Sequence, residues 1–487
     1  MLLAIDIGTS TFKAGILGYN GERLQSLAFP MTFDSREGSY HTADPAQWLQ
    51  AFCHAASQLA NLDKVEGIII SGNGPTVVPV TGEVSFKNGA FMVPADSARL
   101  WLDRRAQEES NAISAIVGGY VDPSFVLPKV LYIKNREEAL YEKTNHIFSS
   151  SEFLAYALTG EARTVFPSEG FDRWYWNNET LEAAGLDAEK FPPFIEPGGF
   201  IGTVLPEVAQ HFGFSRTLPV LAGGPDFFVA ILGTGTVDPG QTCDRSGTSE
   251  GINACTVERI VDPRLMSYGH PVKPYWNCSG IIATTGKALS WGRDLLGMKD
   301  LPYQEYYAFA ATAKPGAGGV VFLPYLAGER APIWDPHARG VFLGLHLGTG
   351  PAELARAVAE GVCFAIQDVI TVINDLGGDV SELRVTGGPG ESTFLNQLKA
   401  DISGCPVLRP TNLNAELLGL GVIGAAALGR FASFKEAADN MVTIEETYFP
   451  QEAHRNMYAD LFSLYRESYR ALKIPFQQLD AAITGAV

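Results

Sequence analysis

The first thirteen residues constrain the fold of this chain more than any other stretch, because they place one acidic residue inside an apolar, strand-like run. Leu2 to Ile7 is apolar except for Asp6, and it leads into Gly8-Thr9-Ser10 and a second strand-like segment. Side chains alternate between the two faces of a strand, so we expect Asp6 on the face opposite Ile5. The stretch predicts two strands joined by a tight glycine turn, with a carboxylate beside the turn.

The polar groups around this turn suit a phosphate. Gly8 permits a sharp turn and a close approach of the backbone to a ligand. Thr9, Ser10 and Thr11 add hydroxyl and amide donors, and Lys13 adds a positive charge. Such donors bind phosphate, and a carboxylate beside them suits Mg²⁺, which phosphate also binds. A plain hairpin with a polar turn is the alternative that this stretch alone leaves open.

Length and charge exclude several classes of protein. A chain of 487 residues exceeds one hydrophobic core, so we expect two domains of roughly 200 to 250 residues each. With 46% hydrophobic and 18% charged residues, the composition is that of a folded globular protein. The net charge of −18 argues against nucleic acid or an anionic membrane as partner, although local donors can still bind a small anion.

Cysteine usage and the N-terminus favour a reducing cytoplasm. The six cysteines are scattered, with neither a close pair nor a Cys/His cluster, so neither a disulfide framework nor a zinc site is expected. Asp6 interrupts the apolar N-terminal run, which argues against a signal peptide. No apolar run reaches the roughly 18 residues that a membrane span needs.

Two loops in the first half are candidates for binding a small molecule. A buried strand over 65–70 ends in Ser71-Gly72-Asn73-Gly74-Pro75, and open α/β sheets bind ligands at the carboxyl ends of strands. The segment 94–109 contains Trp101 and Asp103 before a predicted helix. Trp174-Tyr175-Trp176 lies in a region, 123–186, that we expect to be largely helical and peripheral. Such aromatic clusters are usually core or interface, and they also form platforms for sugar rings.

Asp226 follows a rigid glycine turn at the start of a predicted helix. The strand over 219–222 leads into Gly223-Gly224-Pro225-Asp226 and then an apolar helix over 227–232. A helix N-terminus favours the ionised carboxylate through its dipole and its free amides. A simple N-cap and a functional acid are both consistent with this position.

The second half of the chain repeats the opening pattern. Strands predicted over 241–247 and up to Ala254 flank Gly247-Thr248-Ser249, which echoes the first Gly-Thr-Ser turn and indicates duplicated domains with a boundary near 240–248. A strand over 383–386 then leads through Gly387-Gly388 into a helix, a geometry typical of nucleotide contact. Between them, 351–376 predicts a long helix with one apolar face.

Together these features fit phosphoryl transfer from a nucleotide held between two domains. That reaction needs phosphates cradled by backbone donors, a metal to neutralise charge, and a carboxylate that orients the acceptor hydroxyl and takes its proton. Asp226 suits the carboxylate, and Asp6 suits Mg²⁺ held partly through water.

At this point the sequence resembles the FGGY family of carbohydrate kinases, within the actin-like ATPase superfamily, over almost its whole length. The motifs that carry the resemblance are Ile5 to Ser10 with Lys13 (first phosphate motif), Gly223 to Asp226 followed by Gly233-Thr234-Gly235 (catalytic segment), Ser246 to Ser249 (second phosphate motif), Phe322 to Asp335 (C-terminal signature, the most specific match) and Thr386 to Ser392 (adenosine motif).

The resemblance implies an α/β fold of two ribonuclease-H-like domains, each a mixed sheet flanked by helices, with a cleft between them. Residues 1–243 would form the N-terminal domain with the sugar site, and 244–487 the C-terminal domain. The implied catalytic residue is Asp226, and the implied metal residue is Asp6. ATP would be bound by Gly8, Thr9, Ser10, Thr11, Lys13, Gly247, Thr248, Ser249, Gly387, Gly388 and Ser392.

The implied activity is ATP- and Mg²⁺-dependent phosphorylation of a sugar or polyol hydroxyl, with a ketopentose such as xylulose as the lead substrate. Asn73, Gly74, Trp101 and Asp103 are the candidate substrate residues, together with Asp226. Two segments depart from the family pattern. Asn73 to Thr76 replaces the Gln-Met-His-Gly of xylulose kinases, and Pro389-Gly390 follows the adenosine Gly-Gly. For Trp101-Leu102-Asp103, a structural Asp at a helix start is the alternative.

Other hypotheses remain open on sequence alone. The acceptor can instead be gluconate, a deoxyketose, glycerol or another polyol, and a catalytically silent nucleotide or sugar sensor would share the fold. Retention of Asp226 with Asp6 and both Gly-Thr-Ser turns favours the enzyme. The terminal helix from about residue 451 and the aromatic cluster are candidate surfaces for a homodimer.

Overall fold

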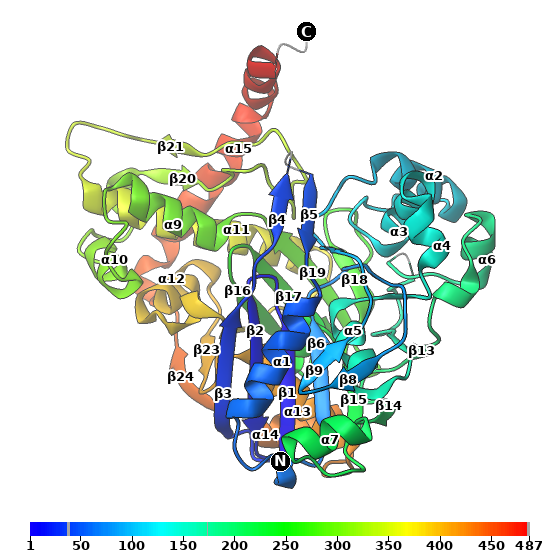
Figure 1. Cartoon of the computed structure of the whole chain (residues 1–487). Coiled ribbons are helices and arrows are strands. Elements are labelled where there is room, and N and C mark those ends of the chain that lie inside the picture. The colour runs from blue at the N-terminus through cyan, green and yellow to red at the C-terminus, as the bar shows by residue number, and fades with distance from the viewer. Residues whose placement is uncertain (37–38, 173, 485–487) are drawn as a thin grey trace. The chain divides into compact units, whose positions relative to one another are not determined.

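Strand β1 (Leu2–Ile7) lies inside a six-stranded mixed sheet with the order β14-β15-β6-β1-β2-β3 (Figure 1). It runs antiparallel to β2 (Thr11–Leu17) and parallel to β6 (Ile68–Gly72), and it pairs Asp6 with Lys13 on one side and Ser71 on the other. The predicted hairpin is confirmed. The other strands are β3 (Arg23–Pro30), β14 (Phe200–Thr203) and β15 (Pro219–Pro225).

The two faces of this sheet have different partners. Leu3, Ile5 and Ile7 are buried in one core with residues of α1 (Ala46–Gln58) and α5 (Ser150–Thr159). The opposite face packs on α13 (Ala415–Ala427), where a Cβ added to Gly424 would lie 3.0 Å from Leu2 Cδ1. Asp6 alternates with Ile5 and Ile7, so the predicted period-two pattern places it on the α13 side.

Helices α8 (Asp226–Gly233) and α13 cross with their backbones almost in contact. A Cβ added to Gly233 would lie 1.8 Å from the Ala415 carbonyl oxygen, and one added to Gly419 would lie 1.8 Å from the Val229 carbonyl oxygen. Only glycine fits at both positions. These contacts join the C-terminal half of α8, which begins at Asp226, to the N-terminal half of α13, which carries Glu416.

A second mixed sheet has the order β18-β19-β17-β16-β22-β23-β24. Apart from the edge strand β18, its pairings repeat those of the first sheet: two antiparallel pairs, then two parallel pairs, then one antiparallel pair. The predicted duplication is therefore visible in the connectivity. The strands are β16 (Gln241–Ser246), β17 (Glu250–Thr256), β18 (Met266–Gly269), β19 (Trp276–Ile282), β22 (Glu382–Thr386), β23 (Val407–Pro410) and β24 (Ile444–Tyr448).

Helix α11 (Pro351–Asp375) forms the centre of the second core. The predicted apolar positions Val358, Val362, Ile366, Val369 and Ile373 are all 2% exposed or less. α11 is long and apolar enough to cross a membrane, but 83% of its most apolar window is buried inside the protein. The neighbouring helices are α9 (Thr285–Leu295), α10 (Tyr303–Ala310), α12 (Thr393–Ser403) and α15 (Arg455–Thr484).

The chain divides into two units in this computed structural model, which describes residues 1–36, 39–172 and 174–484. Unit 1 comprises Met1–Gly233 and Ala415–Val442, and unit 2 comprises Thr234–Asn414 and Thr443–Val487. Unit 1 therefore takes a late segment, which contains α13 and α14 (Phe434–Met441), because α13 covers one face of its sheet.

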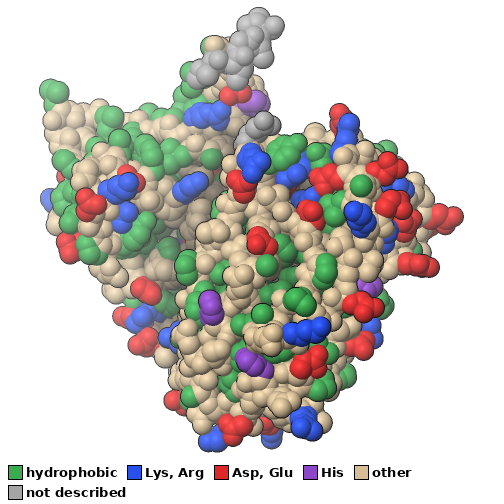
Figure 2. Space-filling model, in the orientation of Figure 1, with side chains coloured by type: hydrophobic (Ala, Val, Ile, Leu, Met, Phe, Trp, Pro, Cys, Tyr) green, Lys and Arg blue, Asp and Glu red, His purple; other side chains and the backbone are tan. Residues whose placement is uncertain are grey.

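The chain also forms shorter helices and strands outside the two large sheets. The region predicted to be largely helical contains α3 (Val126–Arg136), α4 (Glu138–Lys143), α5 and α6 (Asn178–Ala183), separated by short strands. Acidic and basic side chains are interspersed on the surface around α2, α4 and α6 (Figure 2). The remaining elements are β4 (Asp34–Arg36), β5 (Tyr40–Ala43), β7 (Val78–Val80), β8 (Ser85–Lys87), β9 (Ala90–Met92), β10 (Ala98–Arg99), α2 (Gln107–Val117), β11 (His146–Phe148), β12 (Thr164–Val165), β13 (Phe194–Ile195), α7 (Pro206–Phe212), β20 (Val321–Leu323) and β21 (Val341–Leu343).

Candidate active site

Asp6 lies near the carboxyl end of β1 and is only 2% exposed. Its Oδ1 accepts a hydrogen bond from Ser71 Oγ at 2.8 Å, and its Oδ2 lies 3.9 Å from Lys13 Nζ. Burial raises the pKa of Asp6 to about 7, because the favourable Lys13 charge is opposed by Glu416 and Asp226. The strand carboxylate predicted from the sequence thus has one cation and two further acids near it.

Lys13 is held by a residue from the far end of the chain. Its Nζ donates to Glu416 Oε2 at 3.3 Å, and Glu416 lies in the first turn of α13. Although burial lowers the pKa of Lys13, the charges of Glu416 and Asp6 raise it, so the ammonium form is kept. Lys13 is the cation around which the acids of this site gather.

Asp226 is the first residue of α8 and is partly exposed. Its Oδ1 accepts the N–H of Phe227 at 2.6 Å. The preceding turn is tight, since a Cβ added to Gly223 would lie 2.3 Å from the Ile70 carbonyl oxygen. The charge of Asp226 reaches both Asp6 and Lys13, so unit 1 brings these three predicted residues together.

The donor set of this site suits a divalent cation that keeps most of its water. Within the described residues, no group of three or more His, Cys, Asp or Glu side chains forms a cage for a metal ion. The carboxyl groups of Asp6, Asp226 and Glu416 are nevertheless close enough to influence one another electrostatically. Mg²⁺ is usually bound through one or two carboxylates plus substrate phosphates and water, so the residues present fit it.

The turn Gly8 to Ser10 closes by a hydrogen bond from Gly8 N–H to the Thr11 carbonyl, at 3.0 Å. A Cβ added to Gly8 would lie 2.8 Å from that oxygen, which explains the glycine. Trp101 Nε1 donates to Thr9 Oγ1 at 2.8 Å. The structure therefore links Trp101, predicted to contact substrate, directly to the first phosphate turn.

Unit 2 brings the other two nucleotide motifs together. Gly247 and Thr248 are exposed in the turn between β16 and β17, and the Gly247 N–H donates to the Ser249 carbonyl at 2.9 Å. β16 runs parallel to β22, so this turn and Gly387-Gly388 follow neighbouring strands. Gly388 faces open space. Ser392 is the N-cap of α12, and its side chain accepts the Leu395 N–H.

The loop after β6 is fixed by its own side chains. Asn73 Nδ2 donates to the Ile7 carbonyl at 2.9 Å, and its Oδ1 accepts from Thr76 Oγ1 at 2.6 Å. Both amide atoms of this predicted substrate residue are thus engaged in holding the loop on β1. A Cβ added to Gly74 would meet almost nothing, so its backbone is open to a ligand.

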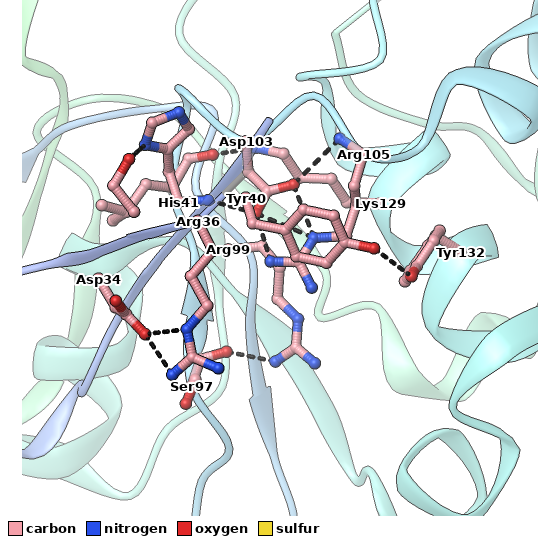
Figure 3. A network of polar contacts seen from close by, with 12 residues as sticks. Asp34, Arg36, Tyr40, His41, Ser97, Arg99, Asp103, Arg105, Lys129 and Tyr132 are labelled. Carbon is pink, nitrogen blue, oxygen red and sulfur yellow. Dashed lines mark hydrogen bonds and ion pairs between the residues drawn. The ribbon is translucent and has the colours of Figure 1, made fainter. Parts of the chain in front are cut away.

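Asp103 is completely buried in a polar network (Figure 3). Its carboxylate accepts the His41 N–H at 2.9 Å and two guanidinium nitrogens of Arg105, Nε at 2.9 Å and Nη2 at 2.6 Å. The Arg105 guanidinium lies 3.9 Å from the centre of the Tyr40 ring, and the Tyr40 and Tyr132 hydroxyls are 3.4 Å apart. In unit 1, Asp103 therefore positions the Trp101 loop, and contact with a substrate stays a prediction.

Lys129 on α3 connects the loop after β6 to the loop that carries Trp101. Its Nζ donates to the Pro75 carbonyl at 2.9 Å and to the Leu100 carbonyl at 2.6 Å. Burial lowers its pKa to about 7, against the charges of Asp103 and Asp122. A single ammonium thus ties the loop after β6 to the segment that carries Trp101.

Sequence reasoning missed Glu416, Ser71, Arg105 and Lys129. Ser71 is the first residue of a loop that the sequence marks as a ligand loop, and Arg105 stands two residues after a predicted site residue. Glu416 and Lys129 carry no local signal, because their roles come from tertiary contacts. The Trp174 ring is partly exposed and packs on Phe171 at 4.5 Å and on Phe227 at 6.1 Å, next to Asp226.

Comparison with known proteins agrees with this arrangement. Two family models match: the N-terminal domain of the FGGY family of carbohydrate kinases over residues 1–233, and its C-terminal domain over 245–428. A xylulose kinase of Klebsiella pneumoniae is 30% identical and covers 97% of this chain and 99% of its own. A gluconokinase of Bacillus subtilis is 24% identical, over 98% of this chain and 97% of its own.

Solved structures show the same fold. A gluconate kinase from Lactobacillus acidophilus superposes with a TM-score of 0.85 at 23% identity, over 98% of this chain and 99% of its own. A ligand-bound xylulose kinase from the same organism gives a TM-score of 0.84 at 23% identity, over 98% and 100% of the two chains. The predicted α/β fold, with mixed sheets flanked by helices, is confirmed.

Proposed function

The chain belongs to the FGGY family of carbohydrate kinases, which phosphorylate sugar or polyol hydroxyls with ATP, and we propose that its acceptor is a ketopentose such as xylulose. The observation that carries the site assignment is the convergence of Asp6, Asp226 and Glu416 on Lys13 in unit 1. Carboxylates gathered around one lysine suit a reaction that must both neutralise phosphate charge and remove a proton from the acceptor hydroxyl.

Asp226 is proposed as the general base. Its position at the start of α8 leaves the carboxylate partly exposed, where it can accept a hydrogen bond from the acceptor hydroxyl and take its proton. In a loose transition state the proton leaves late, so an ordinary carboxylate suffices. The tight packing of Gly223 on β6 holds this carboxylate in place.

The nucleotide contacts are assigned to the three glycine turns. Gly8, Thr9, Ser10, Thr11 and Lys13 offer donors for phosphate from unit 1, and unit 2 offers the exposed Gly247-Thr248-Ser249 turn and the open backbone at Gly387-Gly388. Ser392 acts as the helix cap of that motif. Asp6 would hold Mg²⁺ through water, and the ion would neutralise charge on the phosphates.

Charge pairing favours a neutral acceptor over a sugar acid. Arg105 is paired with the buried Asp103, and Arg104 Nη2 lies 2.9 Å from Asp122. Arg99, the third arginine of this segment, pairs with Asp96 and Glu137, so each arginine of the loop that carries Trp101 already has an acidic partner. This supports a ketopentose ahead of gluconate, while Trp101 and the Gly74 backbone supply a ring face and polar groups for hydroxyls.

We also propose the functional division of residues 1–243 and 244–487: the first holds acceptor and base, the second the second phosphate and adenosine motifs. The residues of unit 1 that come from 415–442 then act as support for the first half, with Glu416 as the one charged contributor to the site.

The direct test is ADP release with Mg²⁺ and ATP across ketopentoses, deoxyketoses, glycerol and other polyols, and gluconate. We expect xylulose to raise ADP release far above the rate without acceptor. Asp226→Asn should lower turnover about a thousandfold, because the base and its charge are both lost. Asp187→Asn, at a surface acid whose side chain is 57% exposed, is the matched control and should leave turnover unchanged.

Other results would redirect the assignment. Stimulation by gluconate alone would overturn the charge-pairing reasoning but keep the kinase. Near-normal turnover of Asp226→Asn would remove Asp226 from the mechanism. ATP binding without stimulation by any acceptor would favour a sensor over an enzyme.

A further inference from the structure

Three ionisable side chains are buried together in unit 2, outside the residues assigned above. They are Asp244 on β16, Glu250 at the start of β17 and Lys399 on α12, which we call the buried triad. Their side chains are 0%, 2% and 2% exposed. Lys399 Nζ donates to Asp244 Oδ2, to Glu250 Oε1 at 2.7 Å and to Ser246 Oγ at 3.0 Å.

The buried triad lies directly under the second phosphate turn. Asp244 and Glu250 bracket Gly247-Thr248-Ser249 on the two strands of its hairpin, where Ser246 pairs with Glu250. Ser246 Oγ donates to Glu250 Oε1 at 2.5 Å and lies 3.3 Å from Asp244 Oδ1. One ammonium therefore fixes oxygen atoms on both sides of the turn.

The same ammonium joins this turn to the adenosine motif. Lys399 belongs to the helix that follows Gly387-Gly388, and β22 before that motif runs parallel to β16, with Thr386 beside Arg245. A Cβ added to Gly387 would lie 1.9 Å from the Ser246 carbonyl oxygen, so the two turns touch. The buried triad thus links the hairpin, through α12, to the only other unit 2 motif assigned to the nucleotide.

Stability alone gives little reason for such a cluster. A buried ion pair costs desolvation, and apolar residues of similar size often stabilise a core as well. Burial and the Glu250 charge raise the pKa of Asp244, whereas Lys399 outweighs burial at Glu250 and lowers its pKa to about 2. What the cluster offers beyond apolar packing is directional contact between three elements.

We propose that Asp244, Glu250 and Lys399 are positioning residues for the nucleotide, which hold the Gly247-Thr248-Ser249 turn against Gly387-Gly388 before the nucleotide binds. The proposal rests on the assignment of these turns to ATP. A turn that is already ordered loses less conformational freedom on binding, so its donors bind phosphate more tightly. The buried triad belongs to unit 2, whereas Asp226, Asn73 and Trp101 belong to unit 1, so we expect its effect to be confined to the nucleotide.

The test compares Lys399→Met with Arg356→Met, which breaks another buried ion pair of unit 2, Arg356 with Glu360 on α11, with side chains 8% and 1% exposed. We expect Lys399→Met to raise the KM for ATP and the Kd for ADP roughly tenfold or more, and to leave the KM for the acceptor within about twofold. Arg356→Met should lower the melting temperature without changing nucleotide affinity.

A double variant separates positioning from stability. In Lys399→Met the two acids that share the Ser246 hydroxyl lose their cation, and adding Asp244→Asn leaves only Glu250 able to ionise. We expect the double variant to regain melting temperature but not ADP affinity, because the link to α12 is still missing. Recovery of affinity together with stability would overturn the positioning role.

Two further outcomes are decisive. ADP binding by the wild type with an unchanged Kd in folded Lys399→Met would overturn the role of the buried triad and keep the proposed function. Absence of ADP binding in the wild type would overturn both. If Lys399→Met does not fold, hydrogen exchange of the wild type decides: slow exchange at 246–250 without nucleotide supports the proposal, and fast exchange there overturns it.

Discussion

At Asp6, burial and two neighbouring acids oppose ionisation, whereas Lys13 and the Ser71 hydroxyl favour it. The balance raises the pKa of Asp6 to about 7 in the protein alone. An added divalent cation would shift this balance toward the carboxylate, because opposite charge stabilises the ionised form. The fold alone therefore does not fully favour the ionised form of Asp6, and a bound cation would do so.

Asp6→Asn tests whether the charge of Asp6 attracts Mg²⁺. The amide keeps the size of the side chain and can still accept the Ser71 hydrogen bond, but it loses the charge that would attract Mg²⁺. We expect turnover to fall about a hundredfold and half-maximal activity to require more Mg²⁺. Asp63→Asn, at an exposed acid, is the control. An unchanged Mg²⁺ titration would contradict the role of Asp6.

Glu329, in the C-terminal signature, behaves differently because its partners are backbone groups. Its Oε1 accepts the Ala283 and Arg330 N–H groups at 2.6 and 2.7 Å, and its Oε2 is buried with no hydrogen-bond partner among the described residues. Burial raises its pKa to about 7 from 4.5 despite these donors. The stability that the neutral acid contributes is complete below pH 4.5 and is lost as the pH rises to about 7.

We therefore expect Glu329→Gln to stabilise the protein at high pH. The amide keeps the accepting oxygen and carries no charge, and the pKa difference corresponds to roughly 3 kcal/mol at about 1.4 kcal/mol per pH unit. Thermal melts at pH 5 and pH 8 should show a gain over the wild type that grows with pH, unlike Glu452→Gln, at an exposed acid. Equal differences at the two pH values would refute the assignment.

At the scale of elements, local patterns specified most helices and strands. The two Gly-Thr-Ser turns form at their predicted positions, and α11 begins and ends within one residue of its predicted limits, 351 and 376. The 123–186 region was harder to predict from sequence, because its short strands and helices depend on tertiary packing rather than on a hydrophobic periodicity. Helix α13 is rich in small residues, and its partner helix α8 lies almost two hundred residues earlier in the chain.

The α8–α13 crossing predicts the effect of Gly419→Ala. The new Cβ would lie 1.8 Å from the Val229 carbonyl oxygen, so the helices must separate. We expect the free energy of unfolding to fall by about 1 to 3 kcal/mol. Turnover should also fall, because separation of the helices would shift Asp226 and Glu416. Gly67→Ala, whose Cβ would have no neighbour closer than 3.4 Å, serves as control. Wild-type stability of Gly419→Ala would show that the crossing is looser than described.

At the scale of the whole molecule, the chain passes from unit 1 to unit 2, returns at Ala415 and leaves again after Val442. The division at 243/244 remains a prediction about function, and it is not a place where the two folding units separate. The homodimer, and the roles of Asn73 and Asp103 toward substrate, also stay predictions.

Cutting the chain at that boundary should therefore fail to yield a folded first half. Residues 1–243 alone would lack α13, whose Leu417, Leu420 and Val422 are at most 1% exposed. Burial of each of these side chains contributes about 1.5 to 3 kcal/mol to the free energy of folding. We expect 1–243 to be insoluble alone and to be rescued by co-expression with 244–487, judged by co-purification and kinase activity. A soluble 1–243 with a cooperative melt would contradict this.

The sequence by itself determined the two Gly-Thr-Ser hairpins, the strand carboxylate Asp6, the glycine turn before Asp226 and the duplicated sheets, because each depends on local period and turn chemistry. Only the tertiary structure decided that Glu416 pairs with Lys13, that Lys129 joins two loops and that Lys399 joins two strands to a helix. These contacts link residues far apart along the chain, and a long-range contact leaves no period in the sequence from which it could be read.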